Sequence, residues 1–178
     1  IQDSLVGSEM CIRDRYAIFH QRFSTNTAPS WNLAQPFRAI AHNGEINTYR
    51  GNKNWMKVHE QEMKSPLFED INNLKPVIRK GVSDSAALDS TIELLVKANR
   101  SLPMAKIITI PEAWSHRRDF PKKIKDLYAY GGAVMEPWDG PAAICGAYGD
   151  WAIAGMDRNG LRPIRYTLTK NLLIAGSE

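Results

Sequence analysis

The stretch Ala41-His42-Asn43-Gly44-Glu45-Ile46-Asn47 decides how this chain can be read, because a short apolar run that starts at Phe37 stops there at Asn-Gly. Asn and Gly adopt positive φ angles more easily than other residues, so we expect a sharp turn after a strand over residues 37–42. Such a turn would direct the Gly44 N–H and the Asn43 side-chain amide outward. Two neighbouring neutral donors can stabilise a developing oxyanion. The alternative is an ordinary Asn-Gly hairpin turn.

Further motifs accompany this stretch in a fixed order. They are HQRFSTNTAPSWNLAQPFRAIAHNGEINTYRGNKNW at residues 20–55, SDS at 83–85, MEPWDGPAA at 135–143 and DRNGLRPIRY at 157–166. Together they resemble the class II glutamine amidotransferase domain of glutamate synthases, which has an N-terminal nucleophile fold. The resemblance covers residues 16–178, and several separated motifs make it far more specific than HNGE alone.

The composition fits one domain or part of a larger protein. The chain has 178 residues, of which 43% are hydrophobic, and can bury one sizeable core. No apolar run approaches the roughly 20 residues of a membrane span, and the start lacks the apolar centre of a secretory signal peptide. We therefore expect a cytoplasmic enzyme with no membrane partner, or one of the plastid stroma if the protein is of the plant type.

Charge, histidines and cysteines point to no nucleic-acid or metal site. The formal net charge is +4, and acidic residues interrupt the densest basic run, residues 116–125. The four histidines show no ligand spacing. Cys11 and Cys145 form no framework, and the apolar run around Cys145 predicts a buried thiol. We expect no metal and no nucleic acid, and read the basic run as a solvated or partner-facing surface.

The pattern of apolar residues predicts an α+β fold. An apolar stripe at i, i+4, i+7 and i+8, from Leu88 to Val96, predicts a helix that Ser83 or Ser85 could cap. Pro111 would start a helical turn at Glu112, and the pair at 131–132 would end the last helix. The resemblance implies a four-layer αββα sandwich, here incomplete. The remaining expected elements are strands over 16–23, 142–148, 151–157, 164–168 and 172–175, and helices over 49–63 and 121–130.

Residues 1–15 have no hydrophobic period and no match to the family motifs. They read like translated adapter sequence, so we expect an artefactual or disordered segment; a flexible natural extension is the alternative. Residues 16–178 form the expected partial amidotransferase domain.

Free glutamine needs a cation for its carboxylate, an anion for its ammonium group and an oxyanion hole for its amide. Arg22 suits the carboxylate because a guanidinium binds it bidentately, and Thr25 could add a donor. The resemblance assigns Asp84 to the ammonium group, and Asn43 and Gly44 to the oxyanion hole. Without it, Arg22 could equally form a surface ion pair, and Asp84 could simply serve the first turn of its helix.

The resemblance implies a nucleophile that this sequence does not contain. It is the N-terminal Cys of the mature protein, whose own α-amino group is the base. Cys11 cannot serve because its nitrogen lies in a peptide bond. We therefore expect an internal fragment that does not hydrolyse glutamine alone. His42 and Glu45 are read as residues that support the turn, and Asp139 and Asp157 as residues that hold loops.

The implied function is the glutaminase step of glutamate synthase, in which glutamine yields glutamate and ammonia. Ammonia would then pass to synthase domains of the same chain and add reductively to 2-oxoglutarate. FMN and an iron–sulfur cluster are implied for the complete enzyme, with a reductase subunit or ferredoxin as partner, and none of these sites lies in this segment. The rival interpretations are another class II amidotransferase, a non-catalytic glutamine-binding domain of the same fold, and a basic interaction module.

Overall fold

The structure is a computed structural model that describes residues 15–21 and 30–177. Its main sheet has three antiparallel strands, β1 (Ile40–Gly44), β2 (Ala142–Tyr148) and β3 (Trp151–Met156), in the order β1-β2-β3. Strands β2 and β3 form a hairpin through Gly149-Asp150, as the turn residues predicted. Within the described residues, β1 therefore lies at an edge of the sheet, although about 100 residues separate it from β2.

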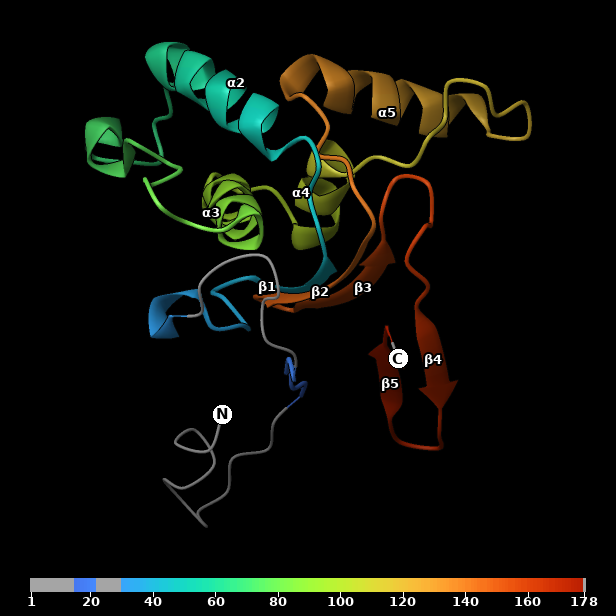
Figure 1. The fold of residues 1–178 in the computed structure, drawn as a ribbon. Coiled ribbons are helices and arrows are strands. Elements are labelled where there is room, and N and C mark those ends of the chain that lie inside the picture. Colours follow the sequence, from blue (N-terminus) through green and yellow to red (C-terminus); the bar gives the residue numbers. More distant parts are fainter. Residues whose placement is uncertain (1–14, 22–29, 178) are drawn as a thin grey trace.

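Helices cover one face of this sheet in two layers (Figure 1). The inner layer is α3 (Asp84–Lys97) and α4 (Leu102–Thr109), which contact the strands directly. The outer layer is α2 (Tyr49–Glu62) and α5 (Lys122–Val134), which pack on α3 and α4 respectively. Short 3-10 helices occupy Trp31–Leu33 and Ile71–Leu74. Mixed helices and antiparallel strands confirm the α+β class.

The α3 helix forms where its cap and apolar stripe predicted it. The Ser83 side chain accepts a hydrogen bond from Ala86 N at 3.1 Å, which satisfies one of the free N–H groups of the first turn. Leu88 and Ile92 are completely buried between the sheet and the outer helices, so the stripe becomes the centre of the core. Asp89 lies on the same buried helix and ties it to β1 through the Ala39 and Ile40 N–H groups, both at 2.9 Å.

Two of the expected elements were wrong, and one expected helix ends later than predicted. Residues 16–21 form no strand, because a β-branched and aromatic run has a propensity but needs a partner strand to pair with. Residues 111–120 contain no helical turn at Glu112; the helix is α4, which ends before Pro111. The α5 helix continues through Gly131 to Val134, because Gly131 is buried where α5 packs on Ile108 and tertiary contact outweighs helix propensity.

A second hairpin, β4 (Arg165–Leu168) and β5 (Leu173–Gly176), stands apart from the main sheet (Figure 1). Asn159-Gly160 turns the chain, but it connects strands of two different sheets and forms no hairpin. Both hairpin strands are exposed, and Leu168 and Leu173 retain 73% and 64% of their accessible surface. The described residues thus leave apolar side chains of this hairpin uncovered.

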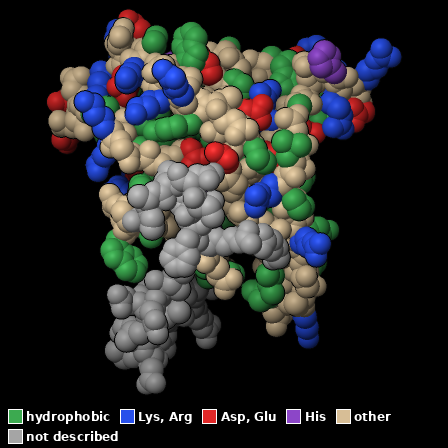
Figure 2. All heavy atoms as spheres, in the orientation of Figure 1, with side chains coloured by type: hydrophobic (Ala, Val, Ile, Leu, Met, Phe, Trp, Pro, Cys, Tyr) green, Lys and Arg blue, Asp and Glu red, His purple; other side chains and the backbone are tan. Residues whose placement is uncertain are grey.

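Basic and acidic side chains are interspersed on the surface. Figure 2 shows Lys and Arg spread over the helical layers and the hairpin, with Asp and Glu among them. In the basic run, Arg117 pairs with Glu112 and Asp119 at 3.0 and 2.7 Å, and Lys122 pairs with Asp126 at 2.7 Å. These pairs are solvent-exposed and contribute little stability, but they neutralise part of the run.

Candidate active site at the end of β1

Asn43 and Gly44 lie in strand β1 and not in a turn, which corrects the prediction. Asn43 pairs with Ala143 and Gly44 with Ala142, so pairing with β2 overrides the local turn preference. Gly44 still needs to be glycine. Its φ is +147°, and an added Cβ would lie 1.9 Å from the Pro141 carbonyl oxygen. The glycine thus allows the two backbones to approach closely at the end of the strand.

The free edge of β1 leaves the Gly44 N–H available. In an antiparallel pair, alternate residues direct their N–H groups away from the partner strand. On β1 these are Ile40, His42 and Gly44, because the bonds Ala147 N to Ala39 O and Glu45 N to Pro141 O place the N–H groups of the odd-numbered residues toward β2. Ile40 N donates to Asp89 at 2.9 Å and His42 N to Gln35 Oε1 at 2.6 Å. Among residues 15–21 and 30–177, the Gly44 N–H finds no acceptor.

The Asn43 side chain is held by two residues from the C-terminal part of the chain. Arg162 Nη1 donates to Asn43 Oδ1 at 2.7 Å, and Asn43 Nδ2 donates to Ser177 Oγ at 2.8 Å. An amide nitrogen carries two hydrogens, so one N–H of Nδ2 remains after the bond to Ser177. Asn43 and Gly44 therefore each have one N–H donor that the described residues leave unused.

Asp84 lies at the same end of β1. It is the first residue of α3, and its Oδ2 accepts from the N–H of Ile46, two residues beyond Gly44, at 2.7 Å. Its Oδ1 accepts from Ser85 Oγ at 3.3 Å. The structure thus brings Asp84 to the strand end that carries Asn43 and Gly44, although about 40 residues separate them in sequence. A partly exposed carboxylate at this position can bind an ammonium group.

His42 supports the site from the core. The residue is 2% exposed, and its Nδ1 lies 2.7 Å from Ser85 Oγ. Ser85 Oγ also lies 3.3 Å from Asp84 Oδ1, and Nε2 of His42 is left without a partner in the described part of the chain. Burial lowers the pKa of His42 to about 4, against a smaller opposing effect of Asp84. The imidazole is therefore neutral near pH 7, and its contact with Ser85 holds the residue that follows Asp84.

The free energy of unfolding should fall as the pH decreases from about 6.5 to 4, because His42 must stay neutral in the folded chain. His42 has a lower pKa in the folded chain than the ordinary 6.5, so between pH 6.5 and 4 the unfolded chain binds a proton that the folded chain does not. We expect urea unfolding at pH 5 to show a free energy of unfolding about 2 kcal/mol lower than at pH 7. His42→Gln should remove this difference, and the matching control replaces the exposed His116. An unchanged pH dependence in His42→Gln would contradict the assignment.

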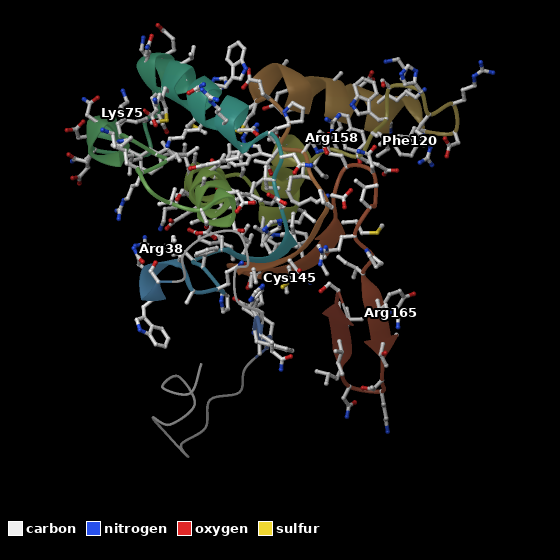
Figure 3. The ribbon with its side chains drawn as sticks, in the orientation of Figure 1. Arg38, Lys75, Phe120, Cys145, Arg158 and Arg165 are labelled. Atoms are coloured by element: carbon white, nitrogen blue, oxygen red, sulfur yellow. The ribbon has the colours of Figure 1, made fainter. Side chains whose placement is uncertain are left out.

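Arg22, Thr25 and Cys11 lie outside the described residues, so their predicted roles stay predictions. Cys145 is in the middle of β2, where Figure 3 places it on the sheet. It is half-buried, not fully buried as predicted, and burial raises the pKa of its thiol. Cys145 therefore lacks the properties of a nucleophile.

Sequence reasoning missed Gln35, Asp89, Arg162 and Ser177, all of which contact β1. Their side chains follow no local pattern that would show a contact to a strand far away in sequence. The prediction that Asp157 holds a loop is confirmed, because its Oδ1 accepts from the N–H groups of Asn159 and Leu161. Burial raises the pKa of its carboxyl group, but hydrogen bonds from four backbone N–H groups together outweigh burial and lower this pKa. Asp139 likewise accepts from Gly140 N at 2.9 Å and pairs with Arg158 at 3.3 Å.

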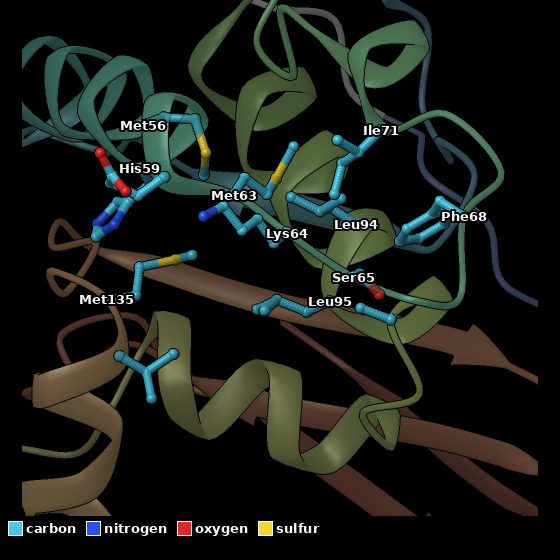
Figure 4. A pocket seen from close by; sticks show the side chains of 13 residues that line it. Met56, His59, Met63, Lys64, Ser65, Phe68, Ile71, Leu94, Leu95 and Met135 are labelled. Atoms are coloured by element: carbon cyan, nitrogen blue, oxygen red, sulfur yellow. The ribbon is translucent and has the colours of Figure 1, made fainter.

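An apolar hollow between α2, α3 and α5 is a separate feature (Figure 4). None of Asn43, Gly44 and Asp84 lines it. The principal residues of the hollow are Met56, Met63, Phe68, Ile71, Leu95 and Met135.

Within the described ranges, no group of three or more His, Cys, Asp or Glu side chains is arranged to hold a metal ion. The helices described here are also too short or too polar to cross a membrane.

The fold and the donor pair at the end of β1 agree with a comparison to known families. The model of the class-II glutamine amidotransferases matches residues 7–178, and the chain belongs to this family. This match begins at residue 7, whereas the resemblance carried by the motifs begins at Tyr16.

Named relatives are glutamate synthases. The chain is 54% identical over 165 residues to the large chain of an NADPH glutamate synthase from Azospirillum brasilense. It is 50% identical over 167 residues to a ferredoxin-dependent glutamate synthase from Pyropia yezoensis, and 51% identical over 166 residues to an NADH glutamate synthase from Schizosaccharomyces pombe. Each alignment covers 92% of this chain but only 11%, 11% and 8% of the respective relative.

Proposed function

We propose that this chain supplies the glutaminase site of a glutamate synthase, which releases ammonia from L-glutamine. The observation that carries the proposal is the pair of unused donors at the end of β1, the Gly44 N–H and one N–H of Asn43, next to the carboxylate of Asp84. The relatives named as glutamate synthases support the choice among class II amidotransferases.

The proposed roles follow from the charges of free glutamine. Asp84 binds the ammonium group, and Arg22 with Thr25 binds the carboxylate. The side-chain carbonyl then lies at the Asn43 and Gly44 donors. As the amide carbon becomes tetrahedral, its oxygen gains negative charge, and fixed donors stabilise that charge without reorganising. The attacking thiolate belongs to the N-terminal cysteine that the family resemblance implies.

Asp84→Asn in the complete enzyme tests the substrate contact. Asparagine keeps an oxygen for the Ile46 N–H, but it lacks the charge that the ammonium group needs. We expect the KM for glutamine to rise by about 10- to 100-fold, with a smaller change in kcat. Ammonia-dependent glutamate formation should keep its rate because it needs no glutamine site. The matched control is Asp126→Asn, an exposed residue of α5.

Two outcomes would contradict the proposal. A normal KM in Asp84→Asn would show that this carboxylate only serves the first turn of α3. Equal losses of glutamine- and ammonia-dependent activity would show a general structural defect.

We also propose that the main sheet belongs to a four-layer αββα sandwich. The helices cover only one of its faces within the described residues, and the β4–β5 hairpin exposes Tyr166, Leu168 and Leu173. In the proposed arrangement a second sheet and its helices cover the remaining face.

The remaining functions belong to the complete enzyme. We propose that ammonia passes to synthase domains of the same chain and adds reductively to 2-oxoglutarate, with FMN and an iron–sulfur cluster outside this segment. The names of the relatives include NADPH, NADH and ferredoxin, so the proposal leaves the electron donor open between a reductase subunit and ferredoxin. Cytoplasm or plastid stroma is the proposed location.

A further inference from the structure

The amide of Asn43 is fixed at both ends. A guanidinium has only donors, so the Asn43 atom that Arg162 contacts at 2.7 Å must be the carbonyl oxygen. The amide nitrogen then faces Ser177 Oγ at 2.8 Å. This arrangement excludes the flipped amide, in which an N–H group would face the Arg162 cation and the carbonyl oxygen would face the developing oxyanion. Orientation of the amide therefore depends on Arg162.

The loop over residues 157–162 gives Arg162 a defined position. Asp157, which is 5% exposed, accepts from the Arg162 N–H at 2.9 Å and from the Ala142 N–H at 3.0 Å. Ala142 pairs with Gly44 across the sheet. One carboxylate thus connects the backbone of Arg162 to the strand that positions Asn43 and Gly44. Two further bonds, from Asn159 N and Leu161 N, close the loop.

The charge of Arg162 adds to its geometric effect. The guanidinium is partly buried, so its hydrogen bond to Asn43 is charge-assisted and less screened than at the surface. A cation on the carbonyl oxygen polarises the amide and makes its N–H groups stronger donors. Arg162 is also close enough to β1 to contribute to the lowered pKa of His42.

We propose that Arg162 is a positioning residue for glutamine hydrolysis, which holds and polarises the Asn43 amide so that one N–H faces the oxyanion. This inference rests on the proposed glutaminase function. Arg162 acts through Asn43 and does not touch the substrate itself. Its role differs from that of Arg158 in the same loop, whose guanidinium pairs with Asp139 at 3.3 Å.

The test compares Arg162→Met, Arg162→Lys and the control Arg158→Met in the complete enzyme. We expect Arg162→Met to lower kcat for glutamine by about 10- to 100-fold, with KM within about threefold, because the lost hydrogen bond matters most in the transition state. Arg162→Lys keeps the charge and one donor, so its kcat should be at least about threefold higher than that of Arg162→Met. Arg158→Met should stay within about threefold of wild type, and ammonia-dependent activity should persist in all three.

A double mutant separates positioning from a general structural role. If Arg162 acts through Asn43, Arg162→Met should cause less than about a threefold further loss when Asn43 is already alanine. Full additivity of the two losses would overturn the inference. So would wild-type kcat in Arg162→Met while Asn43→Ala is impaired. Normal glutamine turnover in Asn43→Ala would instead refute the proposed function. If Arg162→Met fails to fold, Arg162→Gln replaces it in the same cycle, and either wild-type kcat or full additivity with Asn43→Ala would overturn the inference.

Discussion

Asn43→Ala in the complete enzyme is expected to lower kcat for glutamine by about 100- to 1,000-fold, equivalent to about 2.7–4 kcal/mol, with little change in KM. The Asn43 N–H matters mainly once the amide carbon becomes tetrahedral, so the substrate complex should lose little. Ammonia-dependent glutamate formation should continue at the normal rate, since it needs no oxyanion hole. Measuring both reactions in one preparation separates a catalytic loss from a folding defect.

The matched control is Asn171→Ala, which replaces an exposed asparagine at the tip of the β4–β5 hairpin. It should leave both reactions unchanged. If Asn43→Ala turns over glutamine normally, the donor pair at the end of β1 has no catalytic role. A rise in KM without a fall in kcat would instead assign Asn43 to substrate binding.

Gly44→Ala is expected to have the largest effect on stability. An added Cβ would lie 1.9 Å from the Pro141 carbonyl oxygen and 2.9 Å from Ala142 Cα, which are backbone atoms that cannot move aside cheaply. The φ of +147° adds backbone strain for any residue with a side chain. We expect a loss of about 4 kcal/mol in the free energy of unfolding, measured with urea.

Gly51→Ala provides the control for this prediction. Gly51 lies in α2, and an added Cβ would meet no atom within 4 Å. Alanine is the better helix former, so this variant should gain about 0.5–1 kcal/mol. Equal urea midpoints for Gly44→Ala and wild type would show that β1 and β2 separate at this end, and that the site geometry described above is wrong.

Local signals predicted those elements whose formation depends on local chemistry. The apolar stripe, with Ser83 or Ser85 as its cap, predicted α3, and the apolar run before Gly149 predicted β2 and its hairpin with β3. The prediction of a strand at residue 16 was wrong for residues 16–21, because β propensity is realised only when a partner strand supplies hydrogen bonds. Propensity also failed at Gly131, where packing on α4 extends the helix.

In the candidate site, too, some residues were predicted from the sequence and others depended on tertiary contacts. Asn43, Gly44 and Asp84 were chosen from the sequence through the family resemblance, and each carries a group of the kind that glutamine requires. The expected turn at Asn43 was wrong because Ala142 and Ala143, about 100 residues away, pair with this stretch and extend it. Arg162 and Ser177 could not be predicted, since they lie 119 and 134 residues from Asn43 in sequence.

The sequence by itself determined the α+β class, the main helix and the family to which the chain belongs, and it singled out Asn43 and Gly44 as candidates. These follow from local propensity, from periodicity and from residue types that chemistry restricts. Only the tertiary structure decided that Asn-Gly is a strand end, that the Gly44 N–H faces a free edge, and that Arg162 holds the Asn43 amide. The physical reason is that hydrogen-bond partners of an edge strand come from distant segments, whose approach depends on packing of the whole core.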